Sequence, residues 1–66
     1  MKYLVKKGNQ YLNSHVEREP GIKESIECFF DTLEYAWGFD SITSAQEWAN
    51  ISGGTVVLPI VYYSQV

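Results

Sequence analysis

Four acidic side chains recur through the middle of the chain at spacings that could do chemistry. They are Glu24, Glu27, Asp31 and Glu34. Carboxylates in such a group can exchange protons as general acid and base, can bind a metal ion, or can present a row of negative charge. No second set of ligands and no D-x-D-x-D-G calcium loop accompanies them. Two interpretations remain open, a solvated face and an acidic stripe that meets a basic partner.

The other reactive side chains do not complete a catalytic or metal-binding set. His15 is the only histidine and Cys28 the only cysteine. We expect His15 to lie on the surface of a loop, and carboxylates near Cys28 would raise the pKa of its thiol, which opposes a nucleophilic role. A glycine-rich phosphate loop, a G-x-S-x-G turn and a C-x-x-C pair are all absent from the sequence. We therefore expect no enzymatic activity, no catalytic residues, no bound metal and no cofactor.

The acidic side chains lie within residues 22–39, which the spacing predicts to be a helix. At about 100° per residue, seven apolar residues fall in a sector of roughly 120°, and the four acids fall in another of roughly 80°. The apolar residues are Ile22, Ile26, Phe29, Phe30, Leu33, Ala36 and Trp37. Gly38 would then follow the helix end. On this helix Cys28 lies between the acidic stripe and Tyr35, and we include Tyr35 among the candidate binding residues.

The same segment also fits a strand. Ile22, Ile26, Cys28 and Phe30 alternate with polar residues as they would along a strand. In that case Asp31, with Glu34 three residues later, would cap a short helix. The long helix accommodates all seven apolar positions, and it is the interpretation we favour.

Two further elements are predicted on either side of this segment. Residues 2–13 read as a β-hairpin, with Gly8 and Asn9 in its turn. Residues 14–22 read as a loop, with the alternative that the second strand extends as far as Val16. Residues 40–54 read as a second helix, with Ala45 and Trp48 on its inner face and Gly53–Gly54 at its end. Its capping box would be Ser44 with Glu47, or Thr43 with Gln46. Trp37, Phe39 and Trp48 are expected in the core.

The last predicted element, residues 55–63, is a strand that is apolar on both faces. Pro59 cannot donate a ladder hydrogen bond, so we place the strand at a sheet edge. Two helices cannot easily cover both faces of so small a sheet. We therefore expect one face to bind another molecule, either a second copy or a target. Its candidate binding residues are Val57, Val61, Tyr62 and Tyr63.

These elements predict one small α+β domain spanning residues 1–66. The N-terminal hairpin and the C-terminal strand would form one antiparallel sheet, with two helices packed on one face. A chain of 66 residues buries only about 60% of its unfolded surface, so a partner is a natural source of added stability. The single cysteine excludes a disulfide within the chain. It also fits a reducing compartment, so we expect a cytoplasmic protein.

Charge is distributed unevenly and bears on the class of partner. Residues 1–23 hold all five basic residues and two acids, for +3, whereas residues 24–66 hold six acids, for −6, which gives the net charge of −3. Binding to nucleic acid depends on Lys and Arg that neutralise phosphates, so the charge disfavours a nucleic-acid partner. No signal peptide and no apolar run of about 20 residues is present, which argues against a membrane role.

Two stretches resemble small uncharacterised accessory proteins of temperate phages of Gram-positive bacteria. The stretches are KYLVKKGNQYL and LEYAWGFDSITSAQEWANISGGTVV. In those proteins a short hairpin precedes an A-x-x-F-x-S…A…A…G-G-x-V-V segment. The matching positions here are Ala36, Phe39, Ser41, Ala45, Ala49, Gly53, Gly54, Val56 and Val57. The tail LPIVYYSQV is longer than that pattern, and the matching residues are structural, so no catalytic residue carries over. The resemblance implies a phage accessory protein, a class with many small acidic binders of host proteins.

The sequence thus favours a non-enzymatic protein-binding module, such as a phage-type inhibitor of a host or defence protein. It would bind through the acidic face, the last strand, or both. The alternative is a homodimeric assembly protein without a separate target. A third candidate is a nucleic-acid binder that uses the basic hairpin, and it ranks last because of the net charge.

Overall fold

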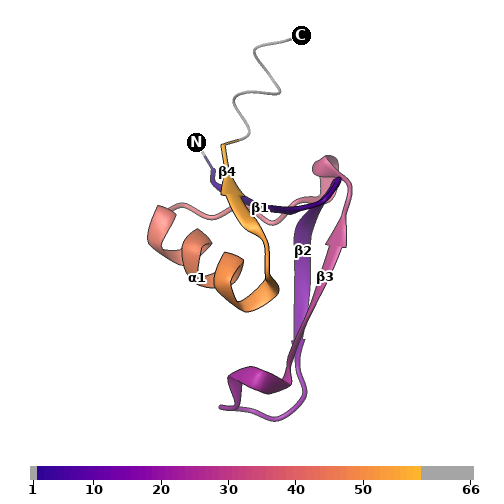
Figure 1. Cartoon of the computed structure of the whole chain (residues 1–66), viewed down its shortest axis with the longest axis vertical. Helices are drawn as coiled ribbons and strands as arrows, with labels where there is room; N and C mark the ends of the chain where they lie inside the picture. The colour runs from indigo at the N-terminus through magenta and orange to yellow at the C-terminus, as the bar shows by residue number, and fades with distance from the viewer. Residues whose placement is uncertain (1, 59–66) are drawn as a thin grey trace, which may run out of the picture.

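The computed structural model describes residues 2–58, which form a four-stranded antiparallel sheet with an α-helix on one face (Figure 1). The elements are β1 (Leu4–Lys7), β2 (Gln10–Glu17), the 3-10 turn η1 (Lys23–Ser25), β3 (Ile26–Asp31), the 3-10 turn η2 (Leu33–Tyr35), α1 (Ile42–Ser52) and β4 (Thr55–Val57). The strand order across the sheet is β3-β2-β1-β4. The α+β class is confirmed. The sheet is larger than predicted, and these residues contain one α-helix instead of two.

The N-terminal hairpin is confirmed. Lys6 lies opposite Tyr11 and Lys7 opposite Gln10, so Gly8 and Asn9 form the turn between β1 and β2. Gly8 has a φ of 62°, a left-handed conformation that costs glycine little. Strand β2 continues to Glu17, so the alternative of an extended second strand is correct, and His15 lies in a strand and not in a loop.

The prediction of a long helix over residues 22–39 is wrong. Residues 26–31 are strand β3, in which Ile26, Cys28 and Phe30 are half-buried while the residues between them are exposed. The apolar residues of this segment fit both a helix and a strand. The strand forms because it can pair with β2 along nearly the whole length of β2. The strand alternative is therefore correct for residues 26–30. Its proposed cap is not, because η2 begins after Thr32 without a side-chain cap.

Helix α1 is confirmed, with a different cap. Ser41 is the N-cap, and its Oγ accepts a hydrogen bond of 3.1 Å from the backbone N–H of Ser44. The boxes predicted at Ser44 and Thr43 are wrong because both residues already lie inside the first turn. At the other end Gly53 has a φ of 80°, and its N–H donates to the carbonyl of Ala49 at 2.9 Å.

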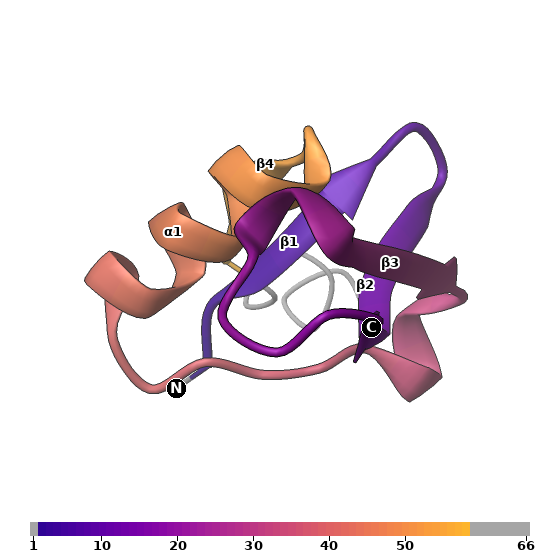
Figure 2. The same cartoon turned by 90° about the horizontal axis from the view of Figure 1, so that it is seen from below.

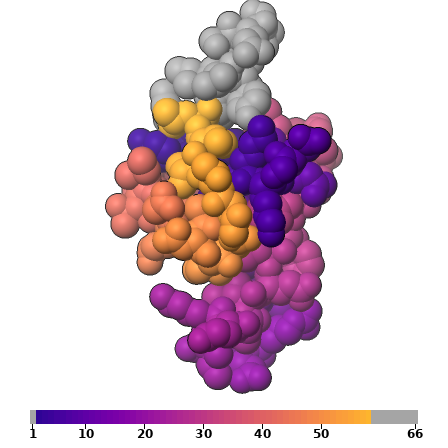
Figure 3. Space-filling view, in the orientation of Figure 1, coloured from indigo at the N-terminus to yellow at the C-terminus, as the bar shows by residue number. Residues whose placement is uncertain are grey.

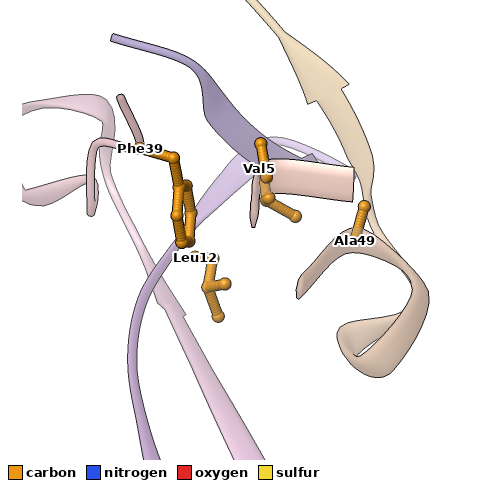
Figure 4. Close-up of a cluster of buried hydrophobic side chains, with 5 residues drawn as sticks. Val5, Leu12, Phe39 and Ala49 are labelled. Atoms are coloured by element: carbon orange, nitrogen blue, oxygen red, sulfur yellow. The ribbon is translucent and has the colours of Figure 1, made fainter. Parts of the chain in front are cut away.

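The core lies between α1 and the sheet. It consists of Val5, Leu12, Phe39, Ala45 and Ala49, four of which are labelled in Figure 4. Trp37 and Trp48 are half-buried and pack against this cluster, as predicted for core residues. Phe39 is held there by a bridge to Tyr3, in which each residue donates a backbone N–H to the other's carbonyl at 2.8 Å.

Strand β4 lies at one edge of the sheet, as predicted for the last strand. It pairs with β1 so that Val57 lies opposite Leu4 and Val56 opposite Val5. Within the described residues it spans Thr55–Val57. The remainder of the predicted strand, including Pro59, Val61, Tyr62 and Tyr63, lies outside the described residues.

Strands β2 and β3 extend beyond the helix-covered part of the sheet. In Figures 1 and 3 the purple and magenta end of this hairpin projects below α1. The pairing shifts between Leu12 and Ser14, so Asn13 is an extra residue in β2. Such a bulge bends a strand and increases its twist. Asn13 is held by its Nδ2, which donates to the carbonyl of Tyr35 at 2.7 Å.

Candidate functional site

Opposite the helix, the β2–β3 hairpin presents a row of exposed side chains. Ser14 pairs with Phe29 and Val16 with Glu27, and directly paired residues share a face of a sheet. Asp31 joins them because it lies two residues beyond Phe29 on β3. We call these five residues the hairpin face, and all five are exposed. Cys28 and Phe30, which alternate with these residues along β3, pack against the core cluster, so the hairpin face is turned away from the core. Figure 2 shows the strands and α1 from below.

Exposure changes sharply along this side of the sheet. Leu4 and Tyr11, which alternate with the core residues Val5 and Leu12, are only 5% exposed. Val16 and Phe29 are 44% and 40% exposed. They are diagonal neighbours across two strands, a spacing at which large side chains can touch. Their exposed apolar surface is the main feature of the hairpin face.

The predicted acidic stripe does not exist, because its residues lie on three different elements. Glu27 and Asp31 lie in β3, on either side of Phe29, whereas Glu24 lies in η1 and Glu34 in η2. The structure therefore brings two of the four acids to one face. It separates the other two from them, since a strand and two turns replace the single helix.

Each acid near the hairpin face has a polar contact. Glu27 forms an ion pair with Arg18, whose Nε also donates to the Glu27 carboxylate at 3.1 Å. Asp31 Oδ1 accepts from the backbone N–H of Thr32 at 2.7 Å, and Thr32 Oγ1 donates to Glu34 at 3.0 Å. Arg18, nine residues before Glu27 in the sequence, thus places a positive charge beside the acids of the hairpin face.

The remaining predicted binding residues are dispersed. Tyr35 is 61% exposed at the end of η2, where its carbonyl accepts the hydrogen bond from Asn13. Val57 is half-buried in β4, at the opposite edge of the sheet from β3. Val61, Tyr62 and Tyr63 lie outside the described residues.

An aromatic cluster on the helix side was not predicted. The ring of His15 stacks on Trp37, with centroids 5.5 Å apart and planes 9° apart, and lies 4.4 Å from Trp48. His15 is half-buried, so it is a packing residue and not the surface residue expected. The strand alternation of β2 continues past Leu12 and could have placed His15. The extra residue Asn13 shifts this alternation by one position, which conceals it in the sequence.

The thiol of Cys28 faces the same side and is only partly accessible. It is half-buried and packs against the core cluster. Burial raises the pKa of Cys28, while the nearby positive charge of Lys7 acts in the opposite direction. The sequence predicted a raised thiol pKa, which agrees in direction, but the cause is burial and not the nearby acidic residues.

Neither the geometry nor known relatives assign this surface a chemistry. Among residues 2–58, no three His, Cys, Asp or Glu side chains converge to hold a metal ion, and none of the helices there could cross a bilayer. Comparisons with protein-family models, curated proteins and solved structures give no match to this chain. What the hairpin face can do must therefore be inferred from its own residues.

Proposed function

We propose that this chain is a non-enzymatic protein-binding module that docks through the hairpin face. The main support is the exposure of Val16 and Phe29, 44% and 40%, on adjacent strands of a face that α1 does not cover. Exposed apolar side chains that gather on one face mark interaction surfaces more often than single scattered ones do. Because this surface lies on paired strands, it is positioned by the fold before any partner binds.

The charges around Phe29 favour a particular kind of partner. Glu27 and Asp31 flank Phe29 along β3, and Arg18 lies beside Glu27. A complementary surface would hold an apolar depression for the phenyl ring, with basic side chains at its rim. Aromatic residues at the centre of such interfaces supply much of the binding energy, and rim charges contribute mainly to specificity and association rate.

The class of partner that we propose is a host or defence protein, which the module would inhibit. This part of the proposal rests on the resemblance to phage accessory proteins and on the net charge of −3. An acidic protein associates faster with a basic surface, and weak steering of this kind decreases as salt increases.

Site-specific photo-crosslinking can identify the partner and its point of contact. Residue 29 is replaced with benzoylphenylalanine, a photoreactive amino acid, and in a second protein residue 42 is replaced in the same way. Both proteins are used in Gram-positive bacterial extracts. Ile42 is the matched control because it is 57% exposed and begins α1, on the other side of the sheet. We expect one protein to be captured from position 29 and not from position 42.

The affinity of the captured protein then tests the proposal directly. Phe29→Ser should weaken binding at least about tenfold, since it removes the central apolar contact, and Ile42→Ser should leave binding unchanged. Asp31→Asn, which keeps a hydrogen-bond acceptor, should weaken it about two- to fivefold, and Glu24→Gln in η1 should not. Equal affinities of the Phe29→Ser and Ile42→Ser proteins would contradict docking through the hairpin face.

A further inference from the structure

Strand β3 forms the other edge of the sheet and, among the described residues, pairs on one side only. Within residues 2–58 its neighbour is β2, and no other strand lies against its outer side. The strand is six residues long, with the sequence IECFFD. It contains no proline and no lysine, the residues that commonly protect such edges from pairing with another chain. Its length and its apolar centre make β3 suitable for strand addition.

The hydrogen-bond pattern shows which backbone groups face this open edge. Arg18 donates its backbone N–H to the carbonyl of Ser25 at 3.3 Å, which makes these two residues a hydrogen-bonded pair. Bonded and non-bonded pairs alternate along an antiparallel ladder. In the register of β2 with β3, Glu27 and Phe29 therefore direct their backbone groups toward β2. Cys28 directs its N–H and carbonyl outward, whereas the N–H of Ile26 donates to the carbonyl of Lys23 in η1.

We propose that the outer edge of β3 pairs antiparallel with the β3 edge of a second copy of this chain, with Cys28 opposite Cys28. In such a dimer a two-fold axis runs perpendicular to the joined sheet. Residues that lie opposite each other must then point to the same face of the sheet, so only a few registers are available. Setting Phe29 opposite Phe29 would place Glu27 opposite Asp31 twice. Setting Glu27 at the axis would oppose two Glu27 side chains. Like charges directly opposite each other are destabilising, and both of these registers contain them.

The register centred on Cys28 avoids this repulsion and matches the apolar residues. It places Ile26 opposite Phe30 of the second copy on the helix side, where both residues are half-buried. On the other side it places Phe29 opposite Glu27 of the second copy. The outward N–H and carbonyl of Cys28 also gain partners in this arrangement. The dimer would join the two sheets into one and set two hairpin faces side by side.

This pairing does not require the hairpin face to bind a target, because the edge and the face are different surfaces of β3. Two strands of six residues bury less area than a standard protein interface. We therefore expect association in the micromolar range, with a dissociation constant of about 10–100 µM.

The test uses two synthetic proteins that differ by one methyl group. Both carry Cys28→Ser, which excludes a disulfide, and one is also N-methylated on the backbone nitrogen of residue 28. The methyl group removes the outward N–H, leaving the bonds to β2 in place. In sedimentation equilibrium we expect the protein without the methyl group to dimerise like wild type. The methylated protein should dimerise at least about tenfold more weakly, because both central bonds are lost. A wild-type protein that stays monomeric at millimolar concentration, or equal dimerisation of the two variants, would overturn the proposal.

The register has its own readout on the wild-type protein, which does not depend on how the variants fold. A dimer that mixes isotope-labelled and unlabelled copies reveals contacts between the two copies alone. In the proposed register, Glu27 of one copy and Phe29 of the second copy form a non-hydrogen-bonded pair. Their α-carbons would lie about 4.5 Å apart, which gives a strong nuclear Overhauser effect between the α-protons. A contact from Glu27 to Asp31 of the second copy, or a dimer without contacts between β3 strands, would refute this pairing.

Discussion

The two ends of the sheet differ in how much apolar surface they bury. Where α1 packs on β1 and β4, Val5, Leu12 and Ala45 are fully buried. Where β2 and β3 extend beyond the helix, Val16 and Phe29 keep 44% and 40% of their surface exposed. The same sheet therefore separates two roles. One end supplies the stability of the fold, and the other presents an apolar surface on a frame that the first end holds in place.

The boundary between the two ends lies at the bulge in β2. Leu12 belongs to the core, and Ser14, two residues later, belongs to the hairpin face. Asn13 between them is fixed by Tyr35, and the backbone N–H of Trp37 donates to the carbonyl of Leu12 at 2.8 Å. The chain after η2 thus anchors β2 at the point where it leaves the core.

The largest effect that we expect separates the two ends by stability. Leu12→Ala should lower the free energy of unfolding by about 3 kcal/mol, because it leaves a cavity at a fully buried site. Val16→Ala on the same strand should lower it by less than about 1 kcal/mol. Urea unfolding followed by tryptophan fluorescence measures both. Similar losses at the two positions would show that the extension is part of the core.

A pair of glycines gives a smaller contrast of the same kind. A Cβ at Gly54 would lie 2.6 Å from Val5 Cγ1 and 3.0 Å from the Lys6 carbonyl, so Gly54→Ala should destabilise by about 2 kcal/mol. Gly21, near the tip of the extension, has no atom within 4 Å of such a Cβ, but its φ is 85°. Gly21→Ala should therefore cost only about 1 kcal/mol. Thermal unfolding of both variants distinguishes crowding from backbone strain. A larger loss at Gly21 would contradict the packing described around Gly54.

The N-cap of α1 should contribute about 1 kcal/mol. Ser41→Ala removes the acceptor for the Ser44 N–H, whereas Thr43→Ala removes a hydroxyl that caps nothing in α1. Chemical denaturation should show the loss for Ser41→Ala and at most a few tenths of a kcal/mol for Thr43→Ala. A larger loss of stability for Thr43→Ala than for Ser41→Ala would indicate that Thr43 is the N-cap, as one of the capping boxes predicted from the sequence requires.

The smallest effect concerns the ion pair between Lys2 and Asp40. The hydrogen bond from Lys2, and then its charge, hold the pKa of Asp40 below its ordinary value. Stability from this pair is thus present above the ordinary aspartate pKa and is lost as the pH falls through the lowered one. A carbon-detected NMR titration should show the Asp40 pKa rise toward its ordinary value in Lys2→Gln and at high salt. An Asp40 pKa that neither change moves would exclude the pair in solution.

The sequence predicted those elements whose local signals agree with each other. The turn at Gly8–Asn9 and the helix that ends at Gly53 both combine a suitable glycine with a clear pattern of apolar residues. The prediction for residues 22–39 failed because their apolar residues fit the period of a helix and that of a strand at once. The choice between them depends on β2, which lies elsewhere in the sequence and needs a pairing partner.

The candidate site shows the same dependence on distant contacts. On the predicted helix Glu27 and Asp31 lie in the acidic stripe, whereas Phe29 lies in the separate apolar sector. On a strand these three residues share an exposed face, so changing the element changes the site. Arg18 reaches Glu27 through the β2–β3 pairing. His15 reaches Trp37 and Trp48 because α1 and the chain after η2 pack on β2, and spacing along the chain does not reveal these contacts.

Amide hydrogen exchange along β3, measured over a dilution series, tests the account most directly. At low concentration, where the protein is monomeric, the amides of Glu27 and Phe29 should be protected by β2 while that of Cys28 exchanges freely. At high concentration the second copy should protect all three. Uniform protection of the three amides in the dilute protein would contradict an open edge at β3.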